Sequence, residues 1–227
     1  MKTSILTILA YFIMCSVSYA SDVYITQSGA SLTANINQDG QTNRFGVSGT
    51  VVTLTGDSQV LDIDQIGNTN TIAASLIGAI QEFTLRQAGS SNTSTVSVGS
   101  NSASGDNSII ETITGSSNTT TVNVGNSAST DDADIDLTAT GDSNTITINE
   151  NSTASMVGSD KKITNITAIG SSNTITSTHT GAADQDTTLH HTGASSTFAI
   201  TQGGAYDGTT SITTVGSGHN VTVTMDD

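Results

Sequence analysis

The residues of this chain that could do chemistry are its carboxylates and histidines, so their spacing is the first guide to function. The densest acidic run is Asp131, Asp132, Asp134 and Asp136, and hard oxygen ligands at this spacing could bind Ca²⁺. The run lacks a D-x-[DN]-x-[DN]-G loop and a glycine-rich nonapeptide repeat. We therefore interpret it as a solvated charge cluster, with Asp134 and Asp136 on the outer face of a strand.

The four histidines do not have the spacing of a metal site. His190 and His191 are adjacent, so they point to opposite faces if the segment is a strand. His179 and His219 are distant from them in the sequence. We expect no metal and no cofactor.

Catalytic motifs are missing as well. The chain has no G-x-S-x-G and no H-E-x-x-H sequence, and Cys15 is its single cysteine. Paired carboxylates do act on the faces of sugar-degrading β-helices. Aromatic platforms for a sugar ring are scarce here, however, because the chain has four Tyr, four Phe and no Trp. The sequence therefore predicts a protein that is not an enzyme.

The N-terminus is typical of a signal peptide. Met1 and Lys2 precede an apolar run from Ile5 to Val17, and Ser18 to Ala20 places small residues at the cleavage positions. We expect cleavage after Ala20, which leaves residues 21–227 as one domain without cysteine and without a membrane insertion.

The charge is strongly acidic and limits the possible partners. The whole chain has a formal net charge of −15, from five Lys or Arg and 20 Asp or Glu. Loss of Lys2 with the leader leaves 4 minus 20, or −16. Nucleic acids and anionic membranes bind proteins through basic surfaces, so neither is an expected partner.

A short repeat runs through the rest of the chain. A glycine stands at its centre, and the glycines recur roughly every 23 residues or at about half that distance. We expect these turn glycines to line up in one column along one edge of the fold. They are Gly29, Gly40, Gly56, Gly67, Gly89, Gly115, Gly141, Gly170, Gly193 and Gly216.

The residues before each glycine alternate with period two, as in Phe83, Leu85 and Gln87 before Gly89. Asn stands three places after most of these glycines, and the alternation then resumes. Such a unit is strand, turn, strand, with aliphatic residues on one face and Thr, Ser, Asn and Asp on the other. Because one thin unit cannot bury a core alone, the units must stack. The sequence predicts an all-β fold, a β-solenoid of stacked strand-turn-strand rungs with two facing sheets.

The repeat is least regular in two places. The alternation places Glu111 inward, and apolar residues fall three apart between Lys161 and Ile169. We expect a bulge or a shift of register there. The Ser, Gly, Asn and Asp-rich spacers Gly99 to Asn107, Gly125 to Asp134 and Asn151 to Asp160 are predicted to be turns or protruding loops between rungs.

The repeat resembles the curlin repeats of curli fibres. The resemblance is carried by segments such as Ile63 to Asn70, Phe83 to Asn92 and Ile135 to Ile148. The first two have Gln, a glycine two later and Asn three after that, and the third keeps the glycine and the Asn. It implies an inward ladder, whose members would be Gln27, Gln38, Gln65, Gln87, Asn70, Asn92, Asn118, Asn144 and Asn173. Several inward Gln positions hold other residues instead, such as Ala139 and Ile113. We therefore expect broken ladders and a more aliphatic core.

The resemblance implies an exported structural subunit of a curli-like extracellular fibre, a functional amyloid of the cell surface that polymerises end to end. Its partners would be other copies of the chain, a nucleator subunit and an export pore.

An alternative is a monomeric solenoid that binds ice or another ordered surface through an outer threonine stripe. Its residues are Thr93, Thr95, Thr119, Thr121, Thr145, Thr147, Thr174 and Thr176. High β-propensity on a solvated face would explain the same threonines more simply. A component of a viral fibre or of a larger adhesin is a third possibility.

Overall fold

The computed structural model describes residues 21–46, 51–78, 80–99, 107–125, 133–151, 161–181, 184–203 and 208–226. Across these ranges the chain forms strands joined by turns, without a helix, and hence without a helix long and apolar enough to span a membrane. The expected leader, residues 1–20, lies outside them, as do most residues of the three spacers and Asp131 and Asp132.

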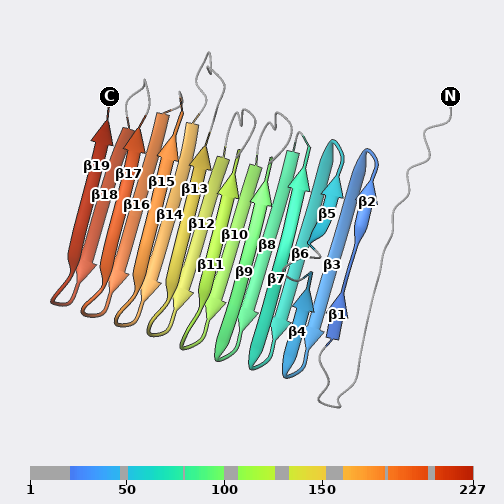
Figure 1. Cartoon of the computed structure of the whole chain (residues 1–227), viewed down its shortest axis with the longest axis horizontal. Helices are drawn as coiled ribbons and strands as arrows, with labels where there is room; N and C mark the ends of the chain where they lie inside the picture. Colours follow the sequence, from blue (N-terminus) through green and yellow to red (C-terminus); the bar gives the residue numbers. More distant parts are fainter. Residues whose placement is uncertain are drawn as a thin grey trace.

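The strands form two parallel sheets that face each other and run the length of the molecule (Figure 1). The all-β solenoid with two facing sheets is thereby confirmed. Sheet 1 has 11 strands: β1 (Ser21–Val23), β2 (Thr26–Ser28), β4 (Thr42–Phe45), β5 (Val52–Thr55), β7 (Thr69–Ile77), β9 (Ser91–Val98), β11 (Thr119–Val124), β13 (Thr145–Asn151), β15 (Thr174–Thr180), β17 (Thr197–Gly203) and β19 (Asn220–Asp226).

Sheet 2 has eight strands: β3 (Ser31–Asp39), β6 (Ser58–Ile66), β8 (Ile80–Ala88), β10 (Asn107–Thr114), β12 (Ala133–Thr140), β14 (Lys161–Ile169), β16 (Asp184–Thr192) and β18 (Gly208–Val215). The chain alternates between the sheets, so each strand of sheet 2 is followed by a strand of sheet 1. We call such a pair, joined by a glycine turn, a layer. The first layer is β3 with β4 and β5, and the last is β18 with β19.

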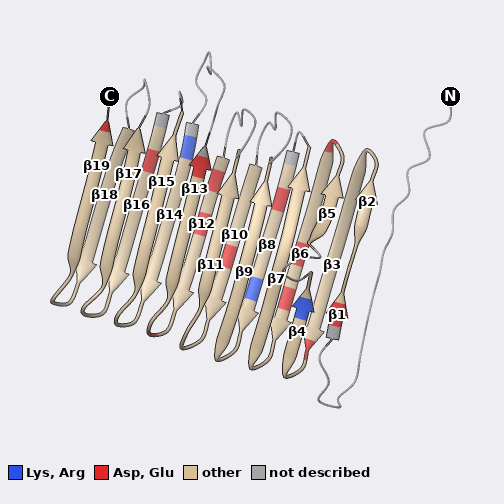
Figure 2. Cartoon of the chain, in the orientation of Figure 1, with Lys and Arg blue, Asp and Glu red and all other residues tan. Residues whose placement is uncertain are grey.

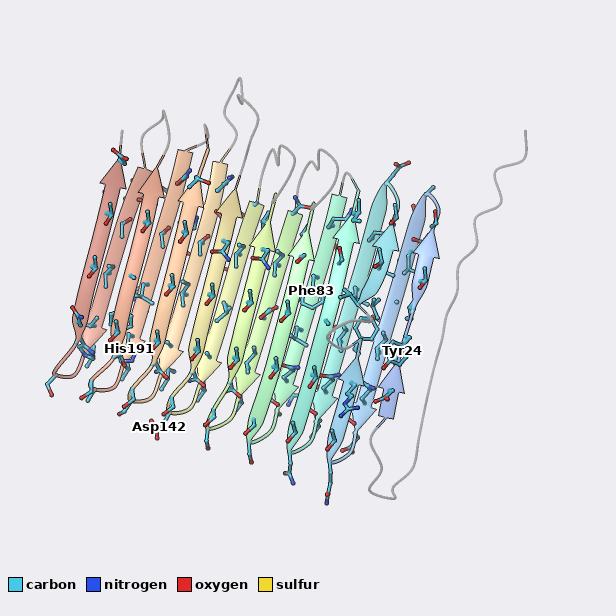
Figure 3. All side chains as sticks on the ribbon, in the orientation of Figure 1. Tyr24, Phe83, Asp142 and His191 are labelled. Carbon is cyan, nitrogen blue, oxygen red and sulfur yellow. The ribbon has the colours of Figure 1, made fainter. Side chains whose placement is uncertain are left out.

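The interior follows the predicted alternation. Phe83 and Leu85 of β8 and Ile135 and Leu137 of β12 are about 1% exposed, while the residues between them face solvent. Parallel pairing in strict register carries this pattern from layer to layer, for example from Phe83 to Ile109 and on to Ile135. Figure 3 shows Phe83 projecting from its strand near the middle of the stack.

The predicted turn glycines form two columns, one on each edge of the solenoid. Gly40, Gly67, Gly89, Gly115, Gly141, Gly170, Gly193 and Gly216 make the long column, in which each glycine lies against the carbonyl of the one before. Gly29 and Gly56 belong to a second column together with Gly78, which the repeat pattern missed. The single column that the repeat suggested is therefore wrong. Both edges reverse the chain between the same two sheets, and glycine recurs at both.

The expected irregularity in β14 is also wrong. Lys161–Ile169 pairs residue for residue with β16, and residues 162–169 pair likewise with β12. The alternation is intact, but it places Lys162 and Thr164 inward and Ile169 outward, 44% exposed. The apolar spacing of three is therefore a change in which residues are buried, not a bulge. Glu111 is inward, as the alternation predicts, and is 1% exposed. The bulge expected near it is wrong as well, because β10 pairs residue for residue with β8 and β12.

The two sheets differ by one strand position. In sheet 1, β4 and β5 lie end to end on β7, and β1 and β2 lie end to end on β4 and β5. The 11 strands therefore occupy 11 minus 2, or nine, positions, against eight in sheet 2. The additional position is that of β1 and β2, which we call together the leading strand.

Candidate functional site

An asparagine ladder runs along the inside of the long glycine column. Asn43, Asn70, Asn92, Asn118, Asn144 and Asn173 are each at most 2% exposed. From Asn43 to Asn144 each side-chain Nδ2 donates to the Oδ1 of the next asparagine, at 3.2, 3.0, 3.0 and 2.9 Å. The repeat pattern predicted broken ladders, but this one is continuous from Asn43 to Asn144. The next contact is made by the backbone N–H of Asn144, which donates to Oδ1 of Asn173 at 2.8 Å. In the last two layers Ser196 and His219 take the asparagine position.

The glutamine ladder is short. Gln65 donates to Gln38 at 2.6 Å, and Gln87 donates to Gln65 at 2.9 Å. The column continues through Ile113 and, in later layers, through Ala139, Ala168, His191 and Thr214.

Gln27 does not belong to this ladder, although the repeat assigned it there. It lies in β2 of sheet 1, in register with Leu54, and its amide donates to Oε1 of Gln59 at 3.1 Å. Gln59 and Gln81 occupy a second inward column of sheet 2 that the repeat pattern did not single out. A search for Gln two residues before the first inward apolar residue of each strand would have found this column.

The predicted threonine stripe is in register on the outer face of sheet 1. Thr93, Thr119, Thr145 and Thr174 follow one another in one column, and Thr95, Thr121, Thr147 and Thr176 in the next. Their side chains are exposed or half-buried. Neighbouring strands are about 4.8 Å apart and alternate residues about 6.8 Å apart. The result is a two-column lattice of hydroxyl and methyl groups.

The described residues place a buried polar cluster between the sheets in the layers β12 with β13, β14 with β15 and β16 with β17. Nδ1 of His179 lies 2.6 Å from Oε2 of Glu150, and its Nε2 lies 2.7 Å from Oγ of Ser177 and 3.0 Å from Oγ1 of Thr187. Thr164 donates to the other oxygen of Glu150 at 2.9 Å. All five side chains are at most 1% exposed.

This cluster has the connectivity of a Ser-His-Glu triad. Ser177 is fully buried, so its hydroxyl has no contact with a substrate in solution in this conformation. The sequence pattern drew attention to His179 but gave no sign of its contact with Glu150. Both stand six residues after a ladder asparagine, and alignment on those asparagines would have placed them side by side.

Two further ionisable groups are buried in the same interior. Burial raises the pKa of Glu111 to about 8, against a smaller lowering by the hydrogen bond from Ser94. Burial lowers the pKa of Lys162, with an opposing contribution from the charge of Glu150. The Lys162 ammonium donates to the carbonyl of Thr180 at 3.5 Å. The side chains of Glu111 and Lys162 lie in columns that other layers fill with apolar or neutral residues.

At the C-terminal end of the stack, the rings of His191 and His219 lie in the glutamine and asparagine columns, and the ring of Phe198 lies beside them. The ring centroids of His191 and His219 are 4.9 Å apart, and that of Phe198 is 5.0 Å from His191. Burial lowers the pKa of His191; its hydrogen bond to the carbonyl of Gly170 opposes this, and the charge of His219 adds to it. As expected, His190 points outward and His191 inward. Figure 3 shows His191 close to the turn edge, on the same side as Asp142.

The inner faces are uncovered at the C-terminal end. Val221, Val223 and Met225 of β19 continue the inward columns of β17, yet are 45%, 43% and 53% exposed. Among the described strands, β19 pairs only with β17, and β18 only with β16. Both therefore present a free edge of backbone donors and acceptors.

The N-terminal end is open in the same way. In the described residues β3 pairs only with β6, so its other edge is free, and the leading strand forms the corresponding edge of sheet 1. Tyr24, half exposed, marks this end in Figure 3. Val23, Ile25 and Ile36 are only partly buried against the core.

The acidic run that was interpreted as a solvated charge cluster is described only in part, because Asp131 and Asp132 lie outside the described residues. Asp134 and Asp136 are exposed on the outer face of sheet 2, as predicted, and Asp136 accepts from Asn165 at 2.8 Å. Within the described ranges no three His, Cys, Asp or Glu side chains gather as metal ligands would. Comparison with protein-family models, curated proteins and solved structures gives no match. The resemblance to curlin repeats therefore depends on the residues alone.

Proposed function

We propose that this chain is an exported, curlin-like structural subunit that polymerises end to end into an extracellular fibre. The observation that carries the proposal is that the described strands leave a free edge at both ends of the solenoid. A parallel stack gains hydrogen bonds with every strand added. A second copy is the partner whose edge repeats the same spacing and the same inward alternation.

The apolar surface at the ends supports this reading. Val221, Val223 and Met225 form a row on β19 that a stacked copy would cover. Large apolar side chains exposed in a row usually mark an interaction surface. Acidic and basic residues are sparse on the strands, with acidic ones in excess (Figure 2). A net charge of −16 for residues 21–227 would keep finished fibres apart laterally.

The remaining parts of the proposal come from the resemblance to curlin. They are export to the cell surface after removal of residues 1–20, a nucleator subunit, an export pore and a role in adhesion or biofilm matrix. No catalytic activity is included.

Electron microscopy of purified residues 21–227 tests polymerisation directly. We expect unbranched filaments with a meridional reflection at about 4.7 to 4.8 Å. A stable monomer at high concentration would contradict the proposal.

Two variants of β19 separate stacking from general effects of charge. Val223→Lys places a charge on the inner face at the open end and is expected to abolish filaments. Thr222→Lys places the same charge on the outer face of the same strand and is expected to leave them intact. Equal loss in both variants would argue against stacking of the inner columns.

The register of the threonine stripe favours a second candidate function, binding to ice or to another ordered surface. Four successive strands hold Thr at both positions, so the hydroxyl and methyl groups repeat in two directions. This reading needs no polymer.

The test is thermal hysteresis or ice shaping by residues 21–227. Thr121→Lys with Thr147→Lys should abolish it. Thr112→Lys with Thr138→Lys, which are in register on the outer face of sheet 2, should not. Activity that survives the first pair, or that is absent in the unmodified chain, would reject this function.

A further inference from the structure

The unequal number of strand positions has a consequence for end-to-end stacking. If β18 of one copy stacks on β3 of the next, sheet 2 continues without a gap. In sheet 1, β19 of the first copy then needs the position next to β4 and β5 of the second. The leading strand already occupies that position. Both sheets can therefore continue through the joint only if the leading strand moves away.

The strand that would take its place matches it closely. The inward columns of sheet 1 lead from Val23 through Phe45 and Ile72 to Val221, as successive register pairs show. By the same registers Gln27 corresponds to Met225. Extending the register of β2 by one residue, from Thr26 back to Ile25, places Ile25 at the position of Val223. Strand β19 thus presents side chains of similar size, one of them more apolar, at the same three inward positions.

The exchange is favourable when both sheets are considered. The leading strand is held by three register pairs to β4 and three to β5. Strand β19 would make the same strand pairs, so the pairing of sheet 1 is retained, and the hydrogen bond from Gln27 to Gln59 is given up. Sheet 2 gains the pairing of the eight residues of β18 with β3, and the exposed Val221, Val223 and Met225 become covered. Without the exchange, β18 and β3 stay one strand position apart and unpaired.

We propose that the leading strand is a displaceable cover on the growing end, and that β19 of a second copy replaces it during assembly. The occupant of the exposed site is therefore a specific segment, Asn220–Asp226 of another subunit. The proposal deepens the fibre function and rests on it. It adds that a subunit protects its own acceptor edge until a partner arrives.

A disulfide lock tests the exchange without disturbing the fold. Thr26 and Thr53 are register partners on the outer face of β2 and β5, at a Cα separation of about 4.8 Å that suits a disulfide. Residues 21–227 contain no other cysteine. Oxidised Thr26→Cys with Thr53→Cys should fold and should not polymerise, and reductant should restore growth.

The matched control pins two strands that never separate. Thr121 and Thr147 are register partners in β11 and β13, and the oxidised Thr121→Cys with Thr147→Cys variant should polymerise as the unmodified chain does. Locked subunits retain a free β19. Added in small amounts to unmodified subunits, they should join the acceptor end and cap it, stopping growth at that end until reductant is added.

A second variant approaches the question from the other side. A chain beginning at Ser31 lacks the leading strand, so it should nucleate with a shorter lag, with its β content checked by circular dichroism. Growth of the oxidised locked variant at the control rate would overturn the displacement. So would a longer lag in the shortened chain. If no variant forms filaments, the fibre function is overturned as well. If only the shortened chain forms filaments, the result supports the leading strand as a cover of the acceptor edge.

Discussion

Nδ1 of His179 lies 2.6 Å from Oε2 of Glu150, across the boundary between two layers. Glu150 follows Val98 and Val124 in one inward column, and His179 follows Glu150. A pair of ionisable groups therefore continues a column that earlier layers fill with leucine and valine. Such a pair is sensitive to the loss of either partner, because the other is left buried without compensation.

The first prediction concerns this pair. His179→Val leaves the Glu150 carboxylate with the hydrogen bond from Thr164 but without its imidazole, and we expect the free energy of unfolding to fall by about 3 to 5 kcal/mol. The double variant Glu150→Val with His179→Val continues the valine column and should be more stable than either single variant. Thermal unfolding of residues 21–227, monitored by circular dichroism, gives the coupling energy between the two side chains. Additive effects of the two substitutions would contradict it.

The second prediction is a dependence of stability on pH through Glu111. Its pKa is raised to about 8 in the folded chain from an ordinary value of 4.5. Below pH 4.5 both states hold the proton. Between 4.5 and 8 only the unfolded state releases it, so stability falls by up to about 1.4 kcal/mol per pH unit. Above pH 8 both states are ionised and this contribution is constant.

Glu111→Gln should remove this fall, since the amide does not titrate. The control is Glu82→Gln, at an exposed position on the neighbouring strand, which should keep the fall seen in the unmodified chain. Melting temperatures measured from pH 4 to 9 compare the three proteins. Parallel curves for the unmodified chain and Glu111→Gln would reject the burial of a titrating carboxyl.

The third prediction concerns the long glycine column. A Cβ on Gly115 would lie 1.8 Å from the carbonyl oxygen of Gly89, which is backbone and has no room to move. Gly115→Ala should therefore lower the free energy of unfolding by about 1 to 3 kcal/mol or more, as is typical of overpacking. Gly203 has no atom within 4 Å of such a Cβ, so Gly203→Ala should unfold near the temperature of the unmodified chain. A similar melting temperature for both variants would show that the layers are not closely stacked there.

The fold was predictable because its two signals are local. Alternation as in Phe83 and Leu85 and a glycine after each strand specify strands, turns and faces. The division of glycines between two edges was not predictable from the repeat, since Gly29 and Gly40 have similar neighbours and differ only in the sheet that the chain is leaving. The straight register of β14 was missed because Lys162 and Thr164 are polar, and burial of a polar residue depends on partners elsewhere.

Most of the candidate site was harder to predict from the sequence, because its contacts also depend on residues elsewhere in the chain. The threonine columns could be predicted because they repeat at one position in each unit. The contact of Glu150 with His179 depends on the register between successive layers. The open ends required knowledge of which sheet each terminal strand joins, and so did the additional position of the leading strand.

The fourth prediction uses the turns of the long column. Ser172, two residues after Gly170, has φ 61°, and Ser143 and Ser195 have φ 62° and 56° at the same place in their turns. In the last layer this place is taken by Gly218, with φ 75°. A left-handed conformation costs an L-residue about 1 to 2 kcal/mol. Ser172→Gly removes this cost. It also lowers the free energy of unfolding by about 0.4 to 1 kcal/mol, because glycine gives the unfolded chain more conformational freedom.

The net expectation is a gain of about 0.5 to 1 kcal/mol for Ser172→Gly. The control is Ser117, which stands two residues after Gly115 and is not among the described residues with positive φ. There Ser117→Gly meets no strain to relieve, so only the cost in the unfolded chain remains and stability should fall by about 0.4 to 1 kcal/mol. Opposite shifts in melting temperature for the same substitution would show that the later turns, unlike that after Gly115, hold serine in a conformation suited to glycine. Shifts of the same sign would contradict it.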